Sequence, residues 1–303
     1  MKLFELLSSS ASSAGVSMSR RRMLLGGTAV AAAATAACGS PLPGLLSAAS
    51  VPASDNVSQD TPVQIFTAAL IAEDLATTFY YNGLVGPVIQ DPNLAGSGGT
   101  AASPASSNSN VPNVGYLRGA LSEEIAHANL MRSLSGGSAA SGDPVQTFYL
   151  PTGCFNTLSA FLGVLNALEN AFIGAYLNAV QEFAQMAADV KSGAQAYKDS
   201  TGKAYSNVQL EYFAKVASSI LGVEAEHRAL GRAINPSASA IPANNLNYQQ
   251  DDGLSSVYNG SASAVAALTP FLNPGSGLTG YSLATALSGA AAVSLATTGN
   301  PPN

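Results

Sequence analysis

The amino-acid sequence predicts an all-α protein: a four-helix bundle with one long crossover connection, plus disordered or irregular N- and C-terminal segments. Four long segments carry apolar residues at helical spacing, Gly- and Pro-rich segments separate them, and a Glu-x-x-His motif occurs twice. Of the 303 residues only 10% are charged, and the net charge is −6. The chain therefore lacks the basic surface that is typical of nucleic-acid binding, and we expect no nucleic acid partner.

Residues 1–38 are interpreted as an export signal of the twin-arginine type. Arg20 and Arg21 stand before a small apolar run, Met23 to Ala37, and this pattern resembles the twin-arginine signal, which implies export of the folded chain. The run is shorter than the roughly 20 residues that a membrane-spanning helix needs. Cys38 lies in a context that resembles a lipoprotein box. We expect a periplasmic or cell-envelope protein, with lipidation at Cys38 as the one route to a membrane.

Two further segments are expected to be irregular. Residues 39–59 are rich in Ser, Ala, Pro and Gly, cannot bury enough apolar surface to fold, and predict a flexible linker. Residues 237–303 form a C-terminal tail that is polar, Gly-rich and Ala-rich, with a short helix expected near Tyr281 to Val293. The bundle itself is expected between them, over residues 60–236.

The first helix of the bundle follows the linker directly. Asp60 or Thr61 suits the helix cap, Pro62 suits the first helical position, and the helix is expected to end near Leu84. A long Gly/Ser/Asn/Pro loop, residues 86–112, comes next.

The same capping and stop signals predict three more helices. They run from about Asn113 to Leu134 with a stop at Gly136-Gly137, from about Asn156 to Lys191, and from about Asn207 to Ile234 with a capping box at Ser206 and Gln209. The loop between the second and third helices, residues 136–153, could stretch to roughly 60 Å at about 3.3 Å per residue. That length crosses a bundle from end to end, so two helical hairpins joined by one crossover are predicted.

The two histidines of the chain occur in two copies of one motif. In LSEEIAHANLMRSL, Glu124 precedes His127 by three residues, and in ILGVEAEHRALGRAI, Glu224 precedes His227 by three. This spacing puts both side chains of a pair on the same side of a helix, one turn apart.

The first and third helices each carry an acid on an apolar stripe. Glu73 shares its stripe with Phe66 and Leu70, and Glu169 shares its stripe with leucines and aromatic residues. A buried lone carboxylate costs several kcal/mol, so each is protonated, paired or bound to a cation. Tyr80 and Tyr176 each follow their Glu by seven residues; hydrogen bonds to the carboxylates and simple packing explain them equally well.

Four carboxylates and two imidazoles together predict a site for two divalent metal ions, because bridging carboxylates neutralise the charge and each histidine holds one ion. The predicted ligands are Glu73, Glu124, His127, Glu169, Glu224 and His227. Iron or manganese fits best, and zinc is not excluded. Two alternatives remain open: core histidines that form ion pairs with the acids, and a bis-histidine haem, which leaves four carboxylates unexplained.

Polar neighbours of these ligands are given simpler roles. We expect Asp74 to face outward, and Glu123 and Glu226 to face solvent or to lie next to the ligands. Arg132 and Arg232 are interpreted as members of surface ion pairs.

The sequence resembles the exported ferritin-like domain family, which includes desiccation-related proteins. The resemblance covers about Asp60 to Asn235 and is carried by AEDLATTFYYNGL, EEIAHANLMRSLSGG, ENAFIGAYLNAV and ILGVEAEHRALGRAI. It implies a ferritin-like four-helix bundle and a metal-binding role for the same six residues. The long loop after the first helix and the C-terminal tail depart from a ferritin cage subunit, so a storage cage is not expected.

The expected function is that of a cell-envelope metalloprotein whose dinuclear iron or manganese centre has oxidase, ferroxidase or peroxide-handling activity, with dioxygen or peroxide as its partner. An alternative is a stress- or desiccation-related structural protein with a bundle-stabilising or vestigial metal site. Plain iron sequestration is a third hypothesis. The sequence leaves open the native metal, the substrate and the oligomeric state.

Overall fold

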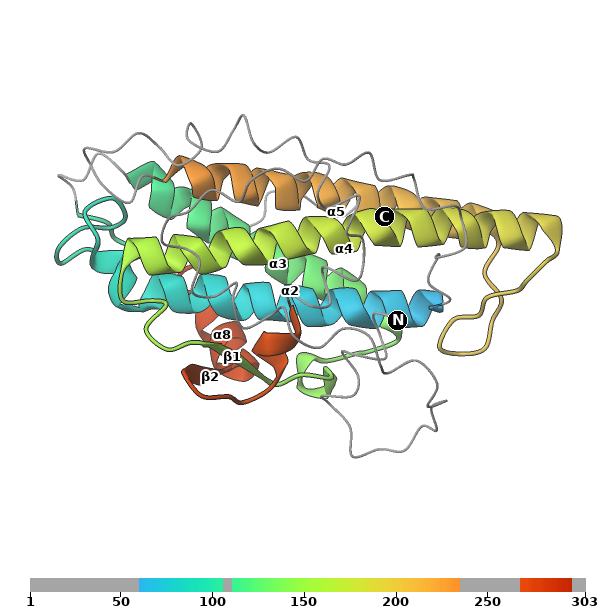
Figure 1. The fold of residues 1–303 in the computed structure, drawn as a ribbon, viewed down its shortest axis with the longest axis horizontal. Coiled ribbons are helices and arrows are strands. Elements are labelled where there is room, and N and C mark those ends of the chain that lie inside the picture. The colour runs from blue at the N-terminus through green and yellow to red at the C-terminus, as the bar shows by residue number, and fades with distance from the viewer. Residues whose placement is uncertain (1–59, 106–110, 235–267, 296–303) are drawn as a thin grey trace, which may run out of the picture.

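The computed structural model describes residues 60–105, 111–234 and 268–295 (Figure 1). The predicted export signal with Cys38, the predicted linker and parts of the C-terminal tail lie outside the described residues. The described chain is mainly helical, and it confirms the predicted four-helix bundle. The bundle helices are α2 (Pro62–Val85), α3 (Val111–Ser135), α4 (Leu158–Ser192) and α5 (Asn207–Ala233).

The helices begin and end where the sequence signals lie. Thr61 caps α2 in a capping box with Gln64, and Ser206 caps α5 in the same way with Gln209. Helix α3 ends at Ser135, directly before Gly136, whose φ of 90° favours glycine. Local capping chemistry therefore fixes the lengths of these helices.

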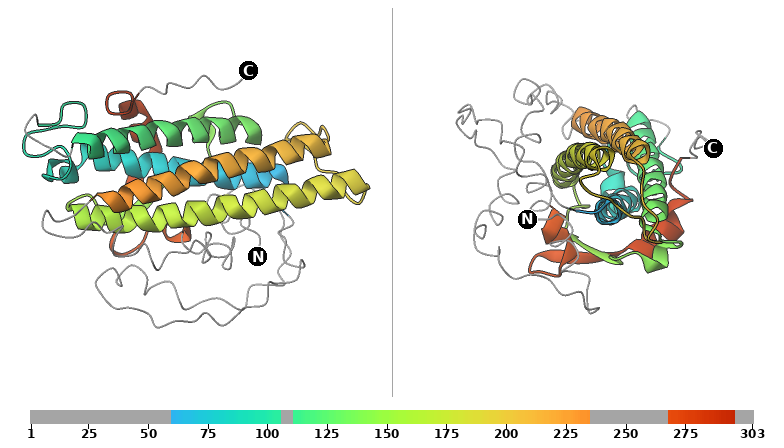
Figure 2. Two further views of the ribbon diagram at one scale, coloured as in Figure 1. Left: turned by 90° about the horizontal axis from the view of Figure 1, so that it is seen from above. Right: turned by 90° about the vertical axis from the view of Figure 1, so that its right-hand side faces the viewer.

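The bundle consists of two helical hairpins. Helix α2 packs mainly on α3, and α4 packs mainly on α5. The connection from α3 to α4 runs back along the bundle through the short helix η3 (Ala140–Gly142) and strand β1 (Thr147–Pro151), as Figures 1 and 2 show. This is the long crossover that the sequence predicts. It brings the N-terminal halves of α2 and α5 and the C-terminal halves of α3 and α4 to one end of the molecule.

A small sheet and a short helix lie against the outside of the bundle. Strand β1 pairs in antiparallel register with β2 (Leu278–Ser282), so that Phe148 faces Tyr281 across the sheet. Helix α8 (Leu283–Ala290) follows β2 and packs on α2. The short helix expected in the tail is therefore present, whereas the sheet was not predicted. The remaining short helices are η2 (Pro87–Gln90) and η5 (Thr269–Leu272).

The buried apolar residues form two cores at the two ends of the bundle. In the first, which we call the Phe161 core, the rings of Phe79 and Phe161 stack with centroids 5.0 Å apart. In the second, the Phe213 core, Phe66 meets Phe213 edge to face at the same separation. The polar residues predicted as ligands lie between these two cores.

Helix α4 is long and apolar enough to cross a membrane by length and composition alone. Within the described residues, however, more than half of its most apolar window is buried in the bundle. Core helices of soluble proteins share this composition, so the helix is explained by its packing.

Candidate metal centre

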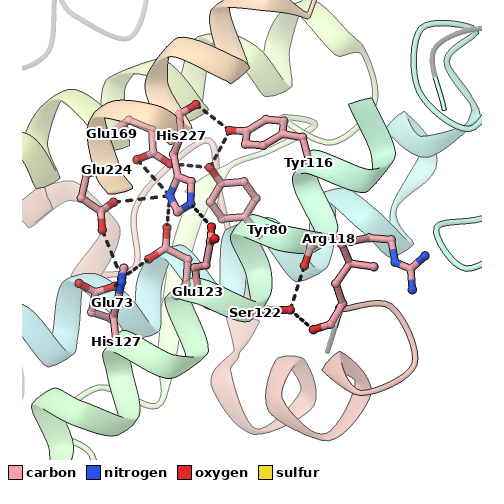
Figure 3. Close-up of polar contacts among 12 residues, drawn as sticks. Glu73, Tyr80, Tyr116, Arg118, Ser122, Glu123, His127, Glu169, Glu224 and His227 are labelled. Carbon is pink, nitrogen blue, oxygen red and sulfur yellow. Dashed lines mark hydrogen bonds and ion pairs between the residues drawn. The ribbon is translucent and has the colours of Figure 1, made fainter. Parts of the chain in front are cut away.

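All six predicted ligand residues meet in the middle of the bundle, and all of them except Glu124 are labelled in Figure 3. One comes from α2, two from α3, one from α4 and two from α5. Five of them are buried, and the side chain of His127 is 13% exposed. Their ligand atoms form two groups in which all atoms lie within 4.8 Å of one another: Glu73, Glu124, His127 and Glu224, and then Glu124, Glu169, Glu224 and His227.

Glu124 and Glu224 belong to both groups, while the other four residues belong to one group each. Each group thus contains one terminal glutamate, one histidine and two shared glutamates. Such an arrangement of carboxylates and imidazoles is compatible with the binding of divalent metal. The i, i+3 spacing on α3 and α5 places each shared glutamate next to the histidine of its own helix.

The inner ring nitrogens of the two histidines point at these carboxylates. Nδ1 of His127 lies 3.4 Å from Oε2 of Glu73 and 3.4 Å from Oε1 of Glu224. On the other side, Nδ1 of His227 lies 3.0 Å from Oε1 of Glu124 and 4.0 Å from Oε2 of Glu169. Both nitrogens are therefore placed to act as ligands.

The inward-facing atoms lack the partners that burial demands. Among the described residues, none hydrogen-bonds the buried Oε2 atoms of Glu73 and Glu169, either oxygen of Glu124 and Glu224, or Nδ1 of the two histidines. Several such atoms in one buried place would cost many kcal/mol if they stayed unsatisfied. Divalent cations would satisfy them, so the residues present fit a metal centre.

Electrostatic effects in the metal-free chain favour protons where cations would bind. Burial, followed by the charge of Glu224, raises the pKa of Glu73 and of Glu169 well above its ordinary value. Burial opposes charging of the two histidines, but the surrounding carboxylates outweigh it, so the pKa of His127 and of His227 is raised. Metal binding must therefore displace protons from these groups.

The pKa of Glu124 is shifted in the opposite direction. Burial alone would raise the pKa of this carboxyl group, but contacts with the imidazoles of His127 and His227 lower it below the ordinary value. The position of Glu124 next to both histidines therefore favours the ionised form of this carboxylate.

Two tyrosines donate hydrogen bonds to the two glutamates that belong to only one ligand group, each to the glutamate of the other helical hairpin. The hydroxyl group of Tyr80 donates a 2.7 Å hydrogen bond to Oε1 of Glu169, and the hydroxyl group of Tyr176 donates to Oε1 of Glu73. The hydrogen-bonding interpretation of these tyrosines is thus confirmed. Each bond leaves Oε2 of the glutamate free to point into the site.

Two residues around His227 add contacts that the sequence did not specify. Oε2 of Glu123 lies 2.8 Å from Nε2 of His227. Tyr116 lies outside the predicted motifs. Its hydroxyl group donates to the backbone oxygen of His227 at 2.7 Å and lies 3.1 Å from the hydroxyl group of Tyr80 (Figure 3). The only sequence signal for Glu123 was its place beside Glu124, and nothing marked Tyr116.

Two expectations about neighbouring charges were wrong. Asp74 does not face outward; it is buried, because the far side of α2 is covered as well. Arg132 is not a surface residue either. Its guanidinium group is buried, donates to both oxygens of Asp143, and lies 3.3 Å from Oδ1 of Asp74. Glu226 is exposed and Arg232 is half-buried, as the expected simpler roles allow.

Residues 61–191 match the family model of the ferritin-like domain. The chain contains a ferritin-like domain. The matched range includes α2, α3, the crossover and α4, with four of the six predicted ligands, and it ends before α5. No curated protein and no solved structure gives a significant match to the chain. The ferritin-like domain and its buried cluster of acids and histidines are together compatible with divalent metal binding.

The donor set of the domain narrows the choice of metal. Carboxylate oxygens and imidazole nitrogens suit divalent iron and manganese, and they accept zinc as well. Cys154 is the only cysteine among the described residues, and it is buried among apolar side chains of the Phe161 core. Within the described residues, neither ligand group contains a thiolate.

Proposed function

We propose that the chain is an exported metalloprotein that binds two ions of iron or manganese at this cluster and reacts with dioxygen or peroxide. One observation supports this proposal most: four buried glutamates and two histidines present ligand atoms without hydrogen bonds to one space between two apolar cores. Four carboxylates balance the charge of two divalent ions, so the loaded site is electrically neutral.

Two such ions supply the electron transfer that the reduction of dioxygen or the breakdown of peroxide needs. The protein residues supply geometry and control of water. Tyr80 and Tyr176 keep the proton on their hydroxyl groups and orient Glu169 and Glu73. The two apolar cores exclude bulk water from both sides, which strengthens every charge interaction inside the site.

Export is part of the proposal and is supported by the sequence of residues 1–38 alone. A twin-arginine signal implies that the chain folds before it crosses the membrane. Metal would then be acquired in the cytoplasm, and the cell envelope would be the place of action. Lipidation at Cys38 would keep the protein at a membrane surface.

The proposal is tested by loading the metal-free protein with Fe²⁺ under argon and then admitting air. We expect about two ions per chain, from the two ligand groups, and consumption of dioxygen on mixing. Glu224→Gln removes a shared carboxylate and should abolish both. Wild-type protein that binds two ions but consumes neither dioxygen nor peroxide, with iron or with manganese, would contradict the catalytic part of the proposal.

A structural role is the second candidate, because each of the four bundle helices contributes a carboxylate and bound ions would brace all of them. In that case metal raises the melting temperature with no redox chemistry to lose. Plain iron sequestration is separated by stoichiometry, since it requires many ions per chain. Elemental analysis of protein from its native compartment distinguishes these functions.

A further inference from the structure

We infer that the two metal positions are unequal: the position of His227 and Glu169 binds its ion tightly, and the position of His127 and Glu73 binds weakly and exchanges. The inference rests on the proposed dinuclear site. It is carried by residues around the ligands that the two copies of the motif do not share.

The surroundings of His227 fix its imidazole ring. Nδ1 faces the centre, and Nε2 lies 2.8 Å from Oε2 of Glu123. If Nδ1 carries no proton and so can bind a metal, Nε2 carries the proton and donates a hydrogen bond to this carboxylate. The hydroxyl group of Tyr116 anchors the backbone at the same residue, and the histidine side chain is only 1% exposed. A carboxylate behind a ligating histidine fixes the tautomer and makes the ligand more basic.

His127 has no such support. Its side chain is 13% exposed, and its contacts with carboxylates within the described parts of the chain all run through Nδ1, so that Nε2 has no acceptor like Glu123. The register of the two motifs explains why. Helices α3 and α5 match at an offset of 100 residues, and the same offset pairs Glu123 with Val223. A valine side chain cannot accept a hydrogen bond from the imidazole ring.

The offset also pairs Tyr116 with Val216, and the smaller side chain leaves space. A cavity of about 30 Å³ lies at this end of the bundle, and its walls include Val216, Tyr176 and Ala72, the residue before Glu73. Its lining is apolar, and its volume is about the share of one water molecule in liquid water. The side of the centre that lacks hydrogen-bonding support thus also borders an apolar cavity.

These differences predict two separate steps in a metal titration. Loss of the group behind a ligating histidine typically reduces metal affinity by about 10- to 100-fold. The position of His127 lacks that group from the start, so we expect its dissociation constant to exceed that of the His227 position by a factor of that size.

Calorimetric titration of the metal-free, full-length protein with Mn²⁺ tests the inference. The variants are Glu123→Leu, which removes the acceptor, and Val223→Glu, which supplies one to His127. Glu226→Gln is the matched control, because it removes one exposed negative charge next to His227. Glu123 is half exposed, so its replacement should leave the fold intact, and a melting curve of each variant checks this.

We expect two steps in the wild type. Glu123→Leu should lower the affinity of the first step about 10- to 100-fold and leave the affinity of the second step unchanged. Val223→Glu should raise the affinity of the second step. Glu226→Gln should change neither affinity. Two equal sites, or equal effects of Glu123→Leu and Glu226→Gln, would overturn the inference while leaving the proposed dinuclear site intact. Absence of any Mn²⁺ binding would instead overturn the proposed site itself.

Discussion

His127 and His227 occupy matching places in two copies of one helical motif, yet their surroundings differ. Both point Nδ1 at shared carboxylates, but only His227 has a carboxylate, Glu123, behind its other ring nitrogen. The Phe161 core lies on the side of His227, whereas the Phe213 core borders a cavity on the side of His127. The comparison teaches that the repeated motif brings the six side chains together, and that residues which the two copies do not share decide how each histidine is supported.

The largest expected effect comes from the residues that the two halves share. Glu124→Gln should remove both metal positions, since its carboxylate belongs to both ligand groups, whereas Glu73→Gln should remove one. The measurement is the number of Mn²⁺ ions per chain after equilibrium dialysis. Equal losses in the two variants would show that the shared and terminal glutamates do not differ in role.

Metal affinity should fall steeply as the pH falls. The pKa values of Glu73, Glu169, His127 and His227 are raised in the metal-free chain, so protons compete with cations at these groups. Each displaced proton changes the binding constant about tenfold per pH unit below the raised pKa. Calorimetry in two buffers of different ionisation enthalpy measures the protons released, and a binding enthalpy independent of the buffer would contradict the expectation.

The stability of the metal-free chain should have the opposite pH dependence. Groups with raised pKa values bind more protons in the folded chain than in the unfolded chain, once the pH exceeds their ordinary values of about 4.3 for Glu and 6.5 for His. Stability is then fully present at lower pH and is lost as the pH rises toward the folded pKa. Urea unfolding of metal-free protein from about pH 6 to 8 should show this decline, and saturating Mn²⁺ should reverse its sign.

The two arginines of the motif give the next comparison. Burial and the charge of Asp143 raise the pKa of Asp74 to about 8, although Arg132 opposes this rise. Arg132→Met leaves two buried acids without their cation and should destabilise the fold by about 3 kcal/mol. Arg232→Met, at the matching place on α5, should cost less than about 1 kcal/mol because that residue is half-buried. Similar unfolding free energies in urea would contradict the assigned difference.

The smallest effects concern the packing of the two halves. Val216→Ile adds one methylene group to the wall of the cavity and should stabilise the fold by up to about 0.8 kcal/mol. Tyr116→Phe removes the hydroxyl group that donates a hydrogen bond to the His227 backbone, and this should destabilise the fold by about 1 kcal/mol. Thermal melting of the metal-free variants measures both changes, and a loss of stability in Val216→Ile would show that the cavity cannot take a methylene group.

The bundle could be predicted from the sequence because its signals are local. Capping boxes at Thr61 and Ser206 and the stop at Gly136 act within one turn, so the helix ends agree with prediction to within about two residues. The sheet was missed because β1 and β2 are each five residues long and pair across most of the chain. Such short strands become stable only through distant partners, which no local pattern reveals.

The convergence of these six side chains was also predictable, because burial makes lone acids on apolar stripes conspicuous. The residues that surround and support these side chains could not be predicted from the sequence. The error over Asp74 arose because α2 is buried on nearly every side, by the bundle on one face and by α8 and the crossover on the other. The contact between Glu123 and His227 joins residues 104 positions apart, and it depends on how α3 and α5 are placed against each other.

The most direct test of the central claim is a crystal structure of the protein soaked in Mn²⁺, with anomalous scattering data at the manganese edge. Two peaks are predicted, one within each of the two ligand groups, with Glu124 and Glu224 contacting both. Peaks confined to the protein surface, or a cluster in which the six side chains hold only protons and water, would contradict a dinuclear centre in this bundle.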